Sequence, residues 1–360
     1  MRIVHIVESF AGGVYAFLYD LIESMPDFEH IIIHGMRSDT PQGYMQNFGQ
    51  NVTFHRWVSA KRGINFWSDL ESLVELIKII KKIPDYKSIN IVHLHSSKAG
   101  FLGRCACRLL GMQDKTIYTP HGVSFLRRDI SRIKKKCYLI FEKFAFRLGG
   151  MIMACSKSES DEITKNGIKS DFINNGVMVA AILPKPCQQP RDYLIIGTAG
   201  RITSSKNPLL FNRIAERFVN MKQIKFLWIG DGELKGDLKS SNIQVTGWQK
   251  QNEVLDMMMQ IDIYLSTSLS EGMPLSALQA MSLAKPLILS NCVGNIDLIF
   301  TNSNGLLFDS YEESIDALLI LINNKELREQ MGNMSRYLAI DHFSINNTMK
   351  QYRQKYIDIA

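Results

Sequence analysis

Residues 1–22 read MRIVHIVESFAGGVYAFLYDLI, and this stretch decides the fold. An apolar run of strand length, 3–7, leads through Gly12 and Gly13 into a helix-length segment at 14–25. Two glycines let the backbone approach a ligand closely and place N–H groups at a helix start, where anions bind well. The loop is not GxGxxG and lacks the acidic ribose contact, which disfavours a nicotinamide dinucleotide. A plain tight turn is the alternative.

The same alternation of strand and helix continues along the chain. Further strand-length runs lie at 30–35, 89–95, 116–119 and 150–156, and helix-length segments at 68–83, 99–111 and 133–148. After a proline-rich break, LPKPCQQPRD (183–192), strands recur at 193–200, 224–230, 243–247, 261–266 and 286–290, with helices at 207–221, 252–260, 275–284 and 312–322. This alternation predicts βαβ units and parallel sheets buried on both faces.

The fold class that follows is α/β, with two doubly wound, Rossmann-like domains. We expect an N-terminal domain over 1–188, a C-terminal domain over 189–340 and a final helix over 341–360. A length of 360 residues suits two domains. The domains should face each other across a cleft, with ligands at the carboxyl ends of the strands.

Composition places the chain among ordinary folded proteins. Hydrophobic residues make up 46% and charged residues 21%, and the six cysteines form no CxxC pair and no Cys/His metal spacing. We therefore expect reduced cytosolic thiols. The sequence shows neither a signal peptide nor an apolar stretch long enough to span a membrane. A cytoplasmic protein, soluble or peripheral on the inner face of the plasma membrane, is the expectation.

The net charge of +7 is concentrated in part in RRDISRIKKKCYLIFEKFAFR (127–147). Basic residues alternate there with Leu, Ile and Phe in an amphipathic pattern, which suits an anionic membrane or lipid head group. The candidates for membrane or acceptor contact are Arg127, Arg128, Lys134, Lys135 and Lys136. A solvated helix face over a buried stripe is the alternative. No motif for nucleic-acid binding accompanies the segment.

Two loops after predicted strands carry charge. In GTAGRITSSKNP (197–208), Arg201 and Lys206 flank a Ser/Thr-rich turn. Two such cations suit a diphosphate, since Arg bonds two oxygens at once and Lys acts as a point charge. The Walker A pattern is absent, and a surface charge pair is the alternative. In WIGDGEL (228–234), Gly230 can approach a ribose or base, and its turn carboxylates make only a weak metal candidate.

The loop SLSEGMPLSALQAM (268–281) places Glu271 before a helix that Pro274 should open. The backbone N–H groups of Leu275 and Ser276 would then point at a phosphate, and Glu271 would accept hydrogen bonds from sugar hydroxyls. A structural cap is the rival interpretation, but caps are mostly Ser, Thr, Asp or Asn. In TPHGVSF (119–125), His121 follows a strand and precedes a glycine, so it contacts either substrate or only its own fold.

Together these loops resemble one family. The order is Gly-Gly after the first strand, then HxHSSKAGFLGR, TPHG, ACSKSE, INNGV, GRITSSKNP, IGDGE, EGMPLSALQAM and NGLLF. This order is similar to that of retaining glycosyltransferases of family 4, which have the GT-B architecture, and the resemblance covers nearly the whole chain. It implies sugar transfer from a nucleotide donor with retention, no metal or other cofactor, and a C-terminal helix that crosses back to the first domain.

The resemblance also implies roles for single residues. Arg201 and Lys206 would stabilise the leaving diphosphate, and Glu271 would hold the donor sugar. His121 would orient that sugar or offer its backbone carbonyl to the developing oxocarbenium ion. Further donor contacts would come from Gly12, Gly13, Gly230, Trp248, Gly272, Met273, Pro274, Leu275 and Ser276.

The motif that begins at Glu271 departs from the family at its second carboxylate. The family's motif is Glu, seven residues, Glu, but the second Glu is replaced here by Gln279. The family's Glu accepts hydrogen bonds from both ribose hydroxyls, whereas Gln has one acceptor oxygen and one donor amide. Losing the charge would weaken donor binding by about 1–2 kcal/mol.

The function that follows is transfer of a sugar, from UDP by family frequency, to a glycan acceptor in bacterial surface polysaccharide synthesis. We expect the acceptor to be lipid-linked, on a polyprenyl diphosphate. Two alternatives stay open at this point. A nucleotide-sugar 2-epimerase shares the fold and would epimerise the donor alone, and a non-catalytic relic would bind nucleotide without turnover.

Overall fold

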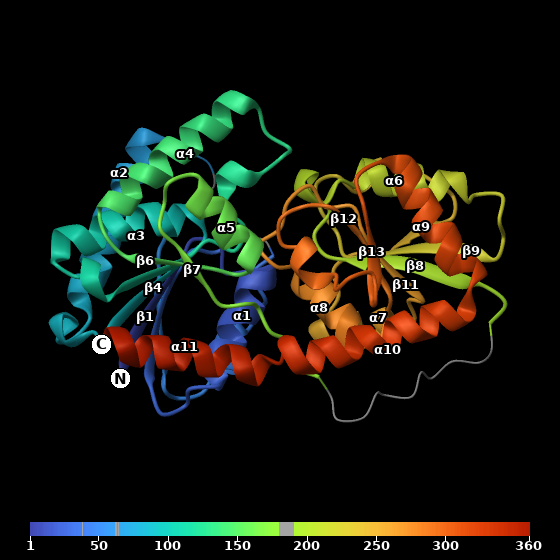
Figure 1. Ribbon diagram of the computed structural model, residues 1–360. Helices are drawn as coiled ribbons and strands as arrows, with labels where there is room; N and C mark the ends of the chain where they lie inside the picture. The colour runs from blue at the N-terminus through green and yellow to red at the C-terminus, as the bar shows by residue number, and fades with distance from the viewer. Residues whose placement is uncertain (38, 62, 64, 180–190) are drawn as a thin grey trace. The chain divides into compact units, whose positions relative to one another are not determined.

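A computed structural model of the 360-residue chain describes residues 1–37, 39–61, 63, 65–179 and 191–360. They form two compact units, each built around its own sheet (Figure 1). The first unit comprises 1–126, 130–174 and 346–360, and the second comprises 127–129 and 175–345. The division near residue 174 thus precedes the predicted boundary at 188. The predicted linker at 183–192 lies almost wholly outside the described residues.

The first unit contains a seven-stranded parallel sheet in the order β3-β2-β1-β4-β5-β6-β7. Its strands are β1 (Arg2–Val7), β2 (Glu29–His34), β3 (Val52–Arg56), β4 (Ile91–His95), β5 (Thr116–Thr119), β6 (Met151–Ala154) and β7 (Asp171–Phe172). Its helices are α1 (Gly12–Glu23), α2 (Phe66–Lys82), α3 (Ser97–Leu110), α4 (Arg132–Arg147), α5 (Lys157–Lys165) and α11 (Ile345–Ile359). The predicted parallel sheet is confirmed.

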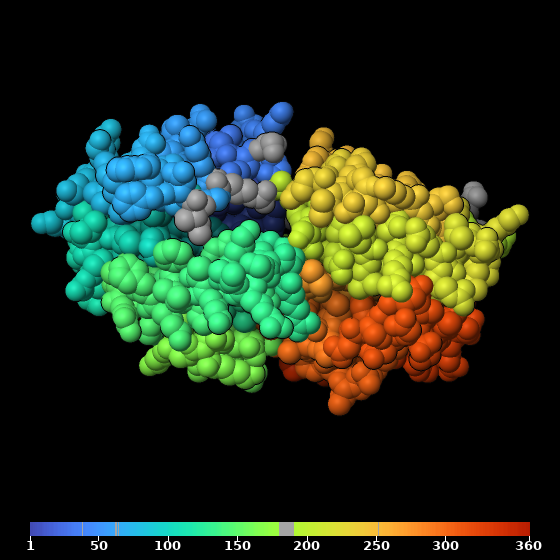
Figure 2. All heavy atoms as spheres, turned by 90° about the horizontal axis from the view of Figure 1, so that it is seen from above, coloured from blue at the N-terminus to red at the C-terminus, as the bar shows by residue number. Residues whose placement is uncertain are grey.

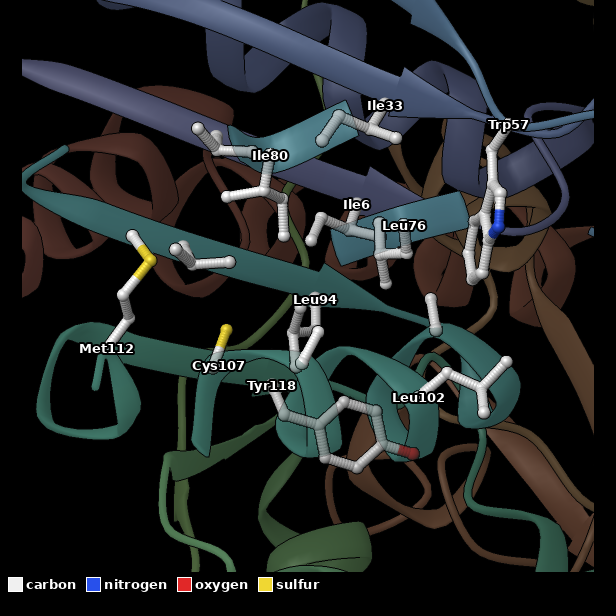
Figure 3. Close-up of a cluster of buried hydrophobic side chains, with 14 of the residues drawn as sticks. Ile6, Ile33, Trp57, Leu76, Ile80, Leu94, Leu102, Cys107, Met112 and Tyr118 are labelled. Carbon is white, nitrogen blue, oxygen red and sulfur yellow. The ribbon is translucent and has the colours of Figure 1, made fainter. Parts of the chain in front are cut away.

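The two faces of this first sheet differ in chemistry. One face packs against α2 and α3 through aliphatic side chains such as Ile6, Leu76 and Leu94, with Tyr118 beside them (Figure 3). The other face carries buried histidines, His5 among them, and is covered by α1 and α11. This polar face reaches the carboxyl edge of the sheet, where loops can meet a ligand.

The second unit contains a six-stranded parallel sheet in the order β10-β9-β8-β11-β12-β13. Its strands are β8 (Leu194–Ala199), β9 (Ile224–Ile229), β10 (Ile243–Val245), β11 (Ile263–Ser266), β12 (Leu287–Ser290) and β13 (Gly305–Phe308). Its helices are α6 (Pro208–Arg217), α7 (Gln251–Met259), α8 (Leu275–Ser282), α9 (Tyr311–Asn323) and α10 (Lys325–His342). In Figure 1, α6 and α9 cover one face of the sheet and α7 and α8 the other.

Short 3₁₀ turns complete the described elements. They are η1 (Tyr44–Asn47), η2 (Tyr86–Ser88), η3 (Gln113–Lys115), η4 (Ser124–Leu126), η5 (Ser204–Lys206), η6 (Lys235–Asp237) and η7 (Ile296–Leu298). Among the described helices, none has the length and apolar character needed to cross a lipid bilayer.

Candidate active site

Lys206 and Glu271 form an ion pair at the carboxyl edge of the second sheet. The loop after β8 supplies the ammonium and the loop after β11, the neighbouring strand, supplies the carboxylate, 2.7 Å away. Two hydrogen bonds join the loops: the Leu269 N–H donates to the Ser205 carbonyl at 2.8 Å, and the Thr267 hydroxyl donates to the Lys206 carbonyl at 2.8 Å. The structure therefore unites two residues that the sequence predicted from separate loops.

Both charged side chains of the pair are largely withdrawn from water, with 22% of Lys206 and 15% of Glu271 exposed. Burial by itself lowers the pKa of Lys206, but the Glu271 carboxylate, with smaller contributions from Tyr264 and Cys292, outweighs it and raises that pKa. Lys206 consequently stays a cation at physiological pH. A fixed positive charge in a sheltered loop suits a phosphate oxygen.

Arg201 lies in the same loop as Lys206 but pairs with a different carboxylate. Its Nε is 3.2 Å from Glu233, which follows β9. The two loops touch backbone to backbone, since a Cβ on Gly230 would lie 2.3 Å from the Gly200 carbonyl oxygen. The other turn carboxylate, Asp231, accepts from the Gly232 N–H at 2.8 Å. These ion pairs and hydrogen bonds give both carboxylates a structural role.

The helix α8 begins with unused backbone donors. Pro274 is its N-cap residue rather than its first helical residue, which corrects the predicted position, and it provides no side-chain cap. No hydrogen bond in the described chain uses the N–H of Leu275 or Ser276. The preceding Met273 is buried, and its carbonyl accepts from the Asn175 side chain at 3.0 Å. The start of α8 thus has the unused N–H groups that the predicted phosphate contact requires.

Asn175 was not among the predicted site residues, although the sequence motif INNGV contains it. Gly272 is buried as well, and a Cβ on Gly294 would lie 2.7 Å from its carbonyl oxygen. Close backbone packing therefore fixes the turn between Glu271 and α8.

Gln279 and Trp248 complete the predicted residues of the second unit. Gln279 lies on α8, about one turn after Ser276, and is half-buried. Its side-chain amide has no hydrogen-bond partner among the residues that the structure describes. Trp248 is 56% exposed and follows β10, the edge strand, two strands away from β8. The strand order thus separates Trp248 from the Lys206–Glu271 pair.

In the first unit, the predicted loops lie at the same carboxyl edge of the sheet, after β1 and β5, which are separated by β4. Gly12 and Gly13 are exposed at the start of α1, and Gly12 has a φ of +54°, which favours glycine. His121 follows β5 with a φ of 53°, a strained value for a side chain with a Cβ. The rings of His121 and Phe17, which lies on α1, have centroids 4.9 Å apart.

Glu159, at the start of α5, holds the His121 loop by hydrogen bonds. Its carboxylate accepts hydrogen bonds from the N–H groups of Gly122 at 3.0 Å, Val123 at 2.8 Å and Cys155 at 2.8 Å. Three bonds to one fully buried carboxylate hold the strained turn in place. The sequence prediction gave Glu159 no role, although the motif ACSKSE contains it.

Four buried histidines were also missed: His5, His30, His93 and His95. Burial, followed by the neighbouring rings, lowers the pKa of His5 and His95 well below the usual value, and burial lowers that of His121 to about 3. Their signal was present, because His93 and His95 alternate along β4 and lie on the same face.

The basic residues of segment 127–147 divide into two groups. Arg127 pairs with Asp129 at 2.5 Å, and Arg128 donates to the Asn291 carbonyl at 3.2 Å, all within the second unit. The predicted set is therefore divided between the two units. Lys134, Lys135 and Lys136 lie on α4 of the first unit, where Lys134 and Lys136 are exposed.

The surface of α4 is unusually apolar for an exposed helix. Ile133, Ile140, Phe141 and Phe144 are exposed by 76%, 66%, 45% and 52%. Figure 2 shows α4 in teal to green across the surface of the first unit. The helix is held to α3 through an ion pair between Arg104 and Glu142. Tyr138, Leu139 and Phe146 of the same helix pack against the core, so α4 has a buried stripe as well. Apolar side chains left exposed on an amphipathic helix are typical of a surface that contacts lipid.

The comparisons with known proteins agree with this arrangement. Residues 11–180 match the family model described as Glycosyltransferase Family 4, and residues 182–337 match that of Glycosyl transferases group 1. The chain is 30% identical over 330 residues to the UDP-Gal:alpha-D-GlcNAc-diphosphoundecaprenol alpha-1,3-galactosyltransferase of Escherichia coli, covering 83% of this chain and 82% of that protein.

Solved structures show the same fold at low identity. Sucrose-phosphate synthase of Thermosynechococcus elongatus has a TM-score of 0.82 at 15% identity, covering 100% of this chain and 99% of that one. Anabaena Alr3699/HepE in complex with UDP and glucose has a TM-score of 0.80 at 14% identity, covering 99% and 100%. The GT-B fold expected from the resemblance is confirmed. The chain belongs to glycosyltransferase family 4 and is a glycosyltransferase.

Proposed function

We propose that this glycosyltransferase moves a sugar from a UDP-sugar to a lipid-linked glycan, with retention at the anomeric carbon, in bacterial surface polysaccharide synthesis. The observation that carries the proposal is the Lys206–Glu271 pair beside the open N-terminus of α8. The names of the relatives support the pathway, because one acts on GlcNAc-diphosphoundecaprenol and another is an O-antigen biosynthesis glycosyltransferase.

The cations of the loop after β8 stabilise the leaving group. As the bond between sugar and diphosphate breaks, negative charge grows on the phosphate oxygens. Lys206 keeps its charge because of Glu271, and Arg201 can bond two oxygens at once. Charges already fixed before the reaction stabilise that transition state more than the ground state.

Glu271 and α8 hold the other parts of the donor. Oε1 of Glu271 pairs with Lys206, and Oε2 makes no hydrogen bond among the described residues, so Oε2 accepts from the sugar hydroxyls. The N–H groups of Leu275 and Ser276 receive a phosphate, and Gln279, about one turn later, reaches the ribose. The roles of Gly12, Gly13, Gly230, Trp248 and His121 stay predictions from the family resemblance.

We propose UDP as the nucleotide and no metal as cofactor. The Escherichia coli relative is named for UDP-Gal, and the Anabaena structure contains UDP and glucose. Arg201 and Lys206 supply the positive charge that a divalent cation would otherwise bring. Activity should therefore persist in excess EDTA, and a requirement for added Mg²⁺ or Mn²⁺ would contradict this part of the proposal.

A thermal-shift screen followed by a transfer assay tests the donor. UDP-galactose, UDP-glucose and UDP-N-acetylglucosamine are compared with UDP alone, because a ligand raises the melting temperature with the logarithm of its concentration over Kd. The true donor is then incubated with a GlcNAc-diphospholipid, and the anomeric configuration of the product is read by NMR. An inverted product, an epimerised donor or no transfer to any lipid-linked glycan contradicts the proposal.

We also propose that α4 docks the enzyme on the cytoplasmic face of an anionic membrane. Its apolar stripe is flanked by Lys134 and Lys136, and α2 exposes Phe66 and Trp67 by 72% and 76%. Such a surface brings the protein to an acceptor whose diphosphate lies at the lipid interface.

Co-sedimentation with vesicles containing phosphatidylglycerol tests the docking surface. The triple substitution Lys134→Gln, Lys135→Gln and Lys136→Gln should reduce binding at low salt. A matched triple in and after α5, Lys157→Gln, Lys165→Gln and Lys169→Gln, removes equal charge elsewhere and should bind more strongly than the α4 triple. Equal binding by the two triples contradicts the role of α4.

A further inference from the structure

The first sheet carries a row of hydrogen-bonded histidines on one face. His5 on β1 lies beside His93 on β4 in the parallel register, and the side chains of His30 on β2 and His95 on β4 reach the same cluster. All four are fully buried. Four imidazoles on the buried face of a sheet are costly unless every ring nitrogen finds a partner.

Four histidines form one continuous chain of hydrogen bonds. It starts at the Met25 carbonyl oxygen, 3.1 Å from His30 Nε2, and His30 Nδ1 lies 3.1 Å from His5 Nε2. His5 Nδ1 lies 3.4 Å from His95 Nε2, and His95 Nδ1 lies 3.1 Å from His121 Nε2. His121 Nδ1 lies 3.5 Å from the Cys155 sulfur. Every link joins the Nδ1 of one ring to the Nε2 of the next.

The Met25 carbonyl at one end of this hydrogen-bond chain determines which ring nitrogens donate and which accept. A carbonyl oxygen only accepts, so His30 must carry its proton on Nε2, and a neutral imidazole then accepts at Nδ1. By the same argument His5, His95 and His121 each carry their proton on Nε2 and accept at Nδ1. The Nδ1 of His121 accepts from the Cys155 thiol. We propose that His30, His5 and His95 are positioning residues that hold His121 as the neutral tautomer protonated at Nε2.

The surroundings keep the whole chain neutral. Burial lowers the pKa of His5, His30 and His95, and the neighbouring rings lower it further for His5 and His95. An added proton would turn one acceptor into a donor and set two N–H groups against each other. A single proton per ring is therefore the arrangement that satisfies every link.

The same geometry argues against a metal at this cluster. Ligand nitrogens of His5, His93 and His95 lie within 4.8 Å of one another, close enough to consider a bound ion. However, His93 Nδ1 is 2.6 Å from the Tyr356 hydroxyl and His93 Nε2 is 2.8 Å from the Thr119 hydroxyl. The nitrogens of His5 and His95 are engaged in the chain. An ion would have to break several of these bonds.

The tautomer of His121 follows from the hydrogen bonds alone. Its effect on sugar transfer rests on the proposed function. With both ring nitrogens of His121 engaged, the side chain has no free nitrogen for substrate or for proton transfer. His121 then acts through the shape of its strained turn and its backbone carbonyl. The three buried histidines act on the reaction through His121, from as far away as β2.

Proton positions can be read directly by NMR in the full-length protein labelled with ¹⁵N-histidine and freed of metal with EDTA. Two-bond ¹⁵N–¹H correlations distinguish the tautomers without substrate. His30, His5, His95 and His121 should all show a protonated Nε2 and an unprotonated Nδ1 at pH 7. A protonated Nδ1 in any of the four overturns the proposal, and so does stoichiometric zinc recovered from the untreated protein.

A matched pair of variants tests transmission along the chain. His30→Phe removes the link to Met25, so His121 should show both tautomers, and kcat should fall in proportion to the fraction protonated at Nε2, with KM unchanged. His34→Phe is the control, because His34 is equally buried on β2 but bonds Tyr44 and Gly35 outside the chain. An unchanged His121 spectrum in a folded His30→Phe protein overturns the proposal. If His30→Phe does not fold, the wild-type tautomers still decide.

Discussion

The carboxyl edge of the second sheet carries a sheltered ion pair, whereas one face of the first sheet carries a row of neutral histidines. Lys206 keeps its charge because the Glu271 carboxylate lies 2.7 Å away and raises the pKa of the ammonium. The histidines, His5 among them, avoid charge and satisfy each other by hydrogen bonds. The first arrangement is sensitive to losing one partner, and the second to gaining one proton.

The largest effect is expected from breaking the ion pair. Lys206→Met keeps the volume of the side chain but removes the charge that stabilises the leaving diphosphate and leaves Glu271 unpaired. We expect kcat to fall by about 100- to 1,000-fold, as when one transition-state donor is lost. Steady-state transfer assays measure it. Lys325→Met is the control, because its pair with Glu329 is 3.8 Å apart and exposed, and it should keep wild-type activity.

The second-largest effect is expected from acid, which should lower the free energy of unfolding by protonating the buried histidines. The pKa of His121 is about 3 in the folded protein, against 6.5 as its usual value, so the unfolded chain binds more protons between these values. Stability is therefore present above pH 6.5 and is lost as the pH falls below it. His121 alone accounts for at most about 2 kcal/mol between pH 6.5 and 5, and the other buried histidines add to this loss.

One carboxyl group opposes this trend. Burial raises the pKa of Asp20 to about 6, so the folded chain gains its proton first as the pH falls. Urea unfolding at pH 7.5, 6.5, 5.5 and 5 measures the sum. We expect the free energy of unfolding to decline steadily below pH 6.5, and the decline to be shallower in His30→Phe. A stability that stays level down to pH 5 would contradict neutral histidines in the fold.

A smaller effect, on donor affinity, is expected from giving a charge to Gln279, the neutral residue near the Lys206–Glu271 pair in the second unit. Gln279→Glu adds a charged acceptor about one turn into α8, where the family has its second Glu. Donor binding should tighten by about tenfold, since a charge-assisted hydrogen bond adds about 1–2 kcal/mol. Calorimetric titration with UDP-sugar and with UDP measures it. Gln351→Glu, at an exposed position of α11, should leave affinity unchanged, and weaker binding by Gln279→Glu would exclude a ribose contact.

The smallest effect concerns a single hydrogen bond at the histidine face. Tyr356→Phe removes the hydroxyl that lies 2.6 Å from His93 Nδ1. We expect the free energy of unfolding to drop by about 1 kcal/mol, the usual value for one buried hydrogen bond. Tyr337→Phe, on a tyrosine that is 60% exposed, should change stability very little. Equal urea midpoints for the two variants would mean that the Tyr356 hydroxyl contributes nothing.

The sequence predicted the buried parallel strands well, because runs such as 3–7 and 224–230 are almost wholly apolar. It missed β3, β7 and β13 among the strands, and α5 and α10 among the helices. The edge strand β3 is only half-buried, β13 has four residues, and α5 reads KSESDEITK with almost no apolar periodicity. Weak burial leaves a weak pattern in the sequence.

The candidate site was predicted in its parts but not in its pairings. Lys206 and Glu271 were both predicted, yet only the order of β8 and β11 brings their loops together. A lone histidine in a strand usually has a structural role, so His5 and His30 gave no signal by themselves. Whether these histidines bond to one another depends on the register between strands, and a local sequence pattern does not specify that register.

The bond between His93 and Tyr356 joins residues 263 positions apart. During synthesis, β4 is made long before α11, so the face of the first sheet that needs Tyr356 remains uncovered while the ribosome translates the entire second unit. The second unit, whose strands and helices are nearly continuous in the chain, can close first. Although its gene segment is read first, the first unit is the last to be completed.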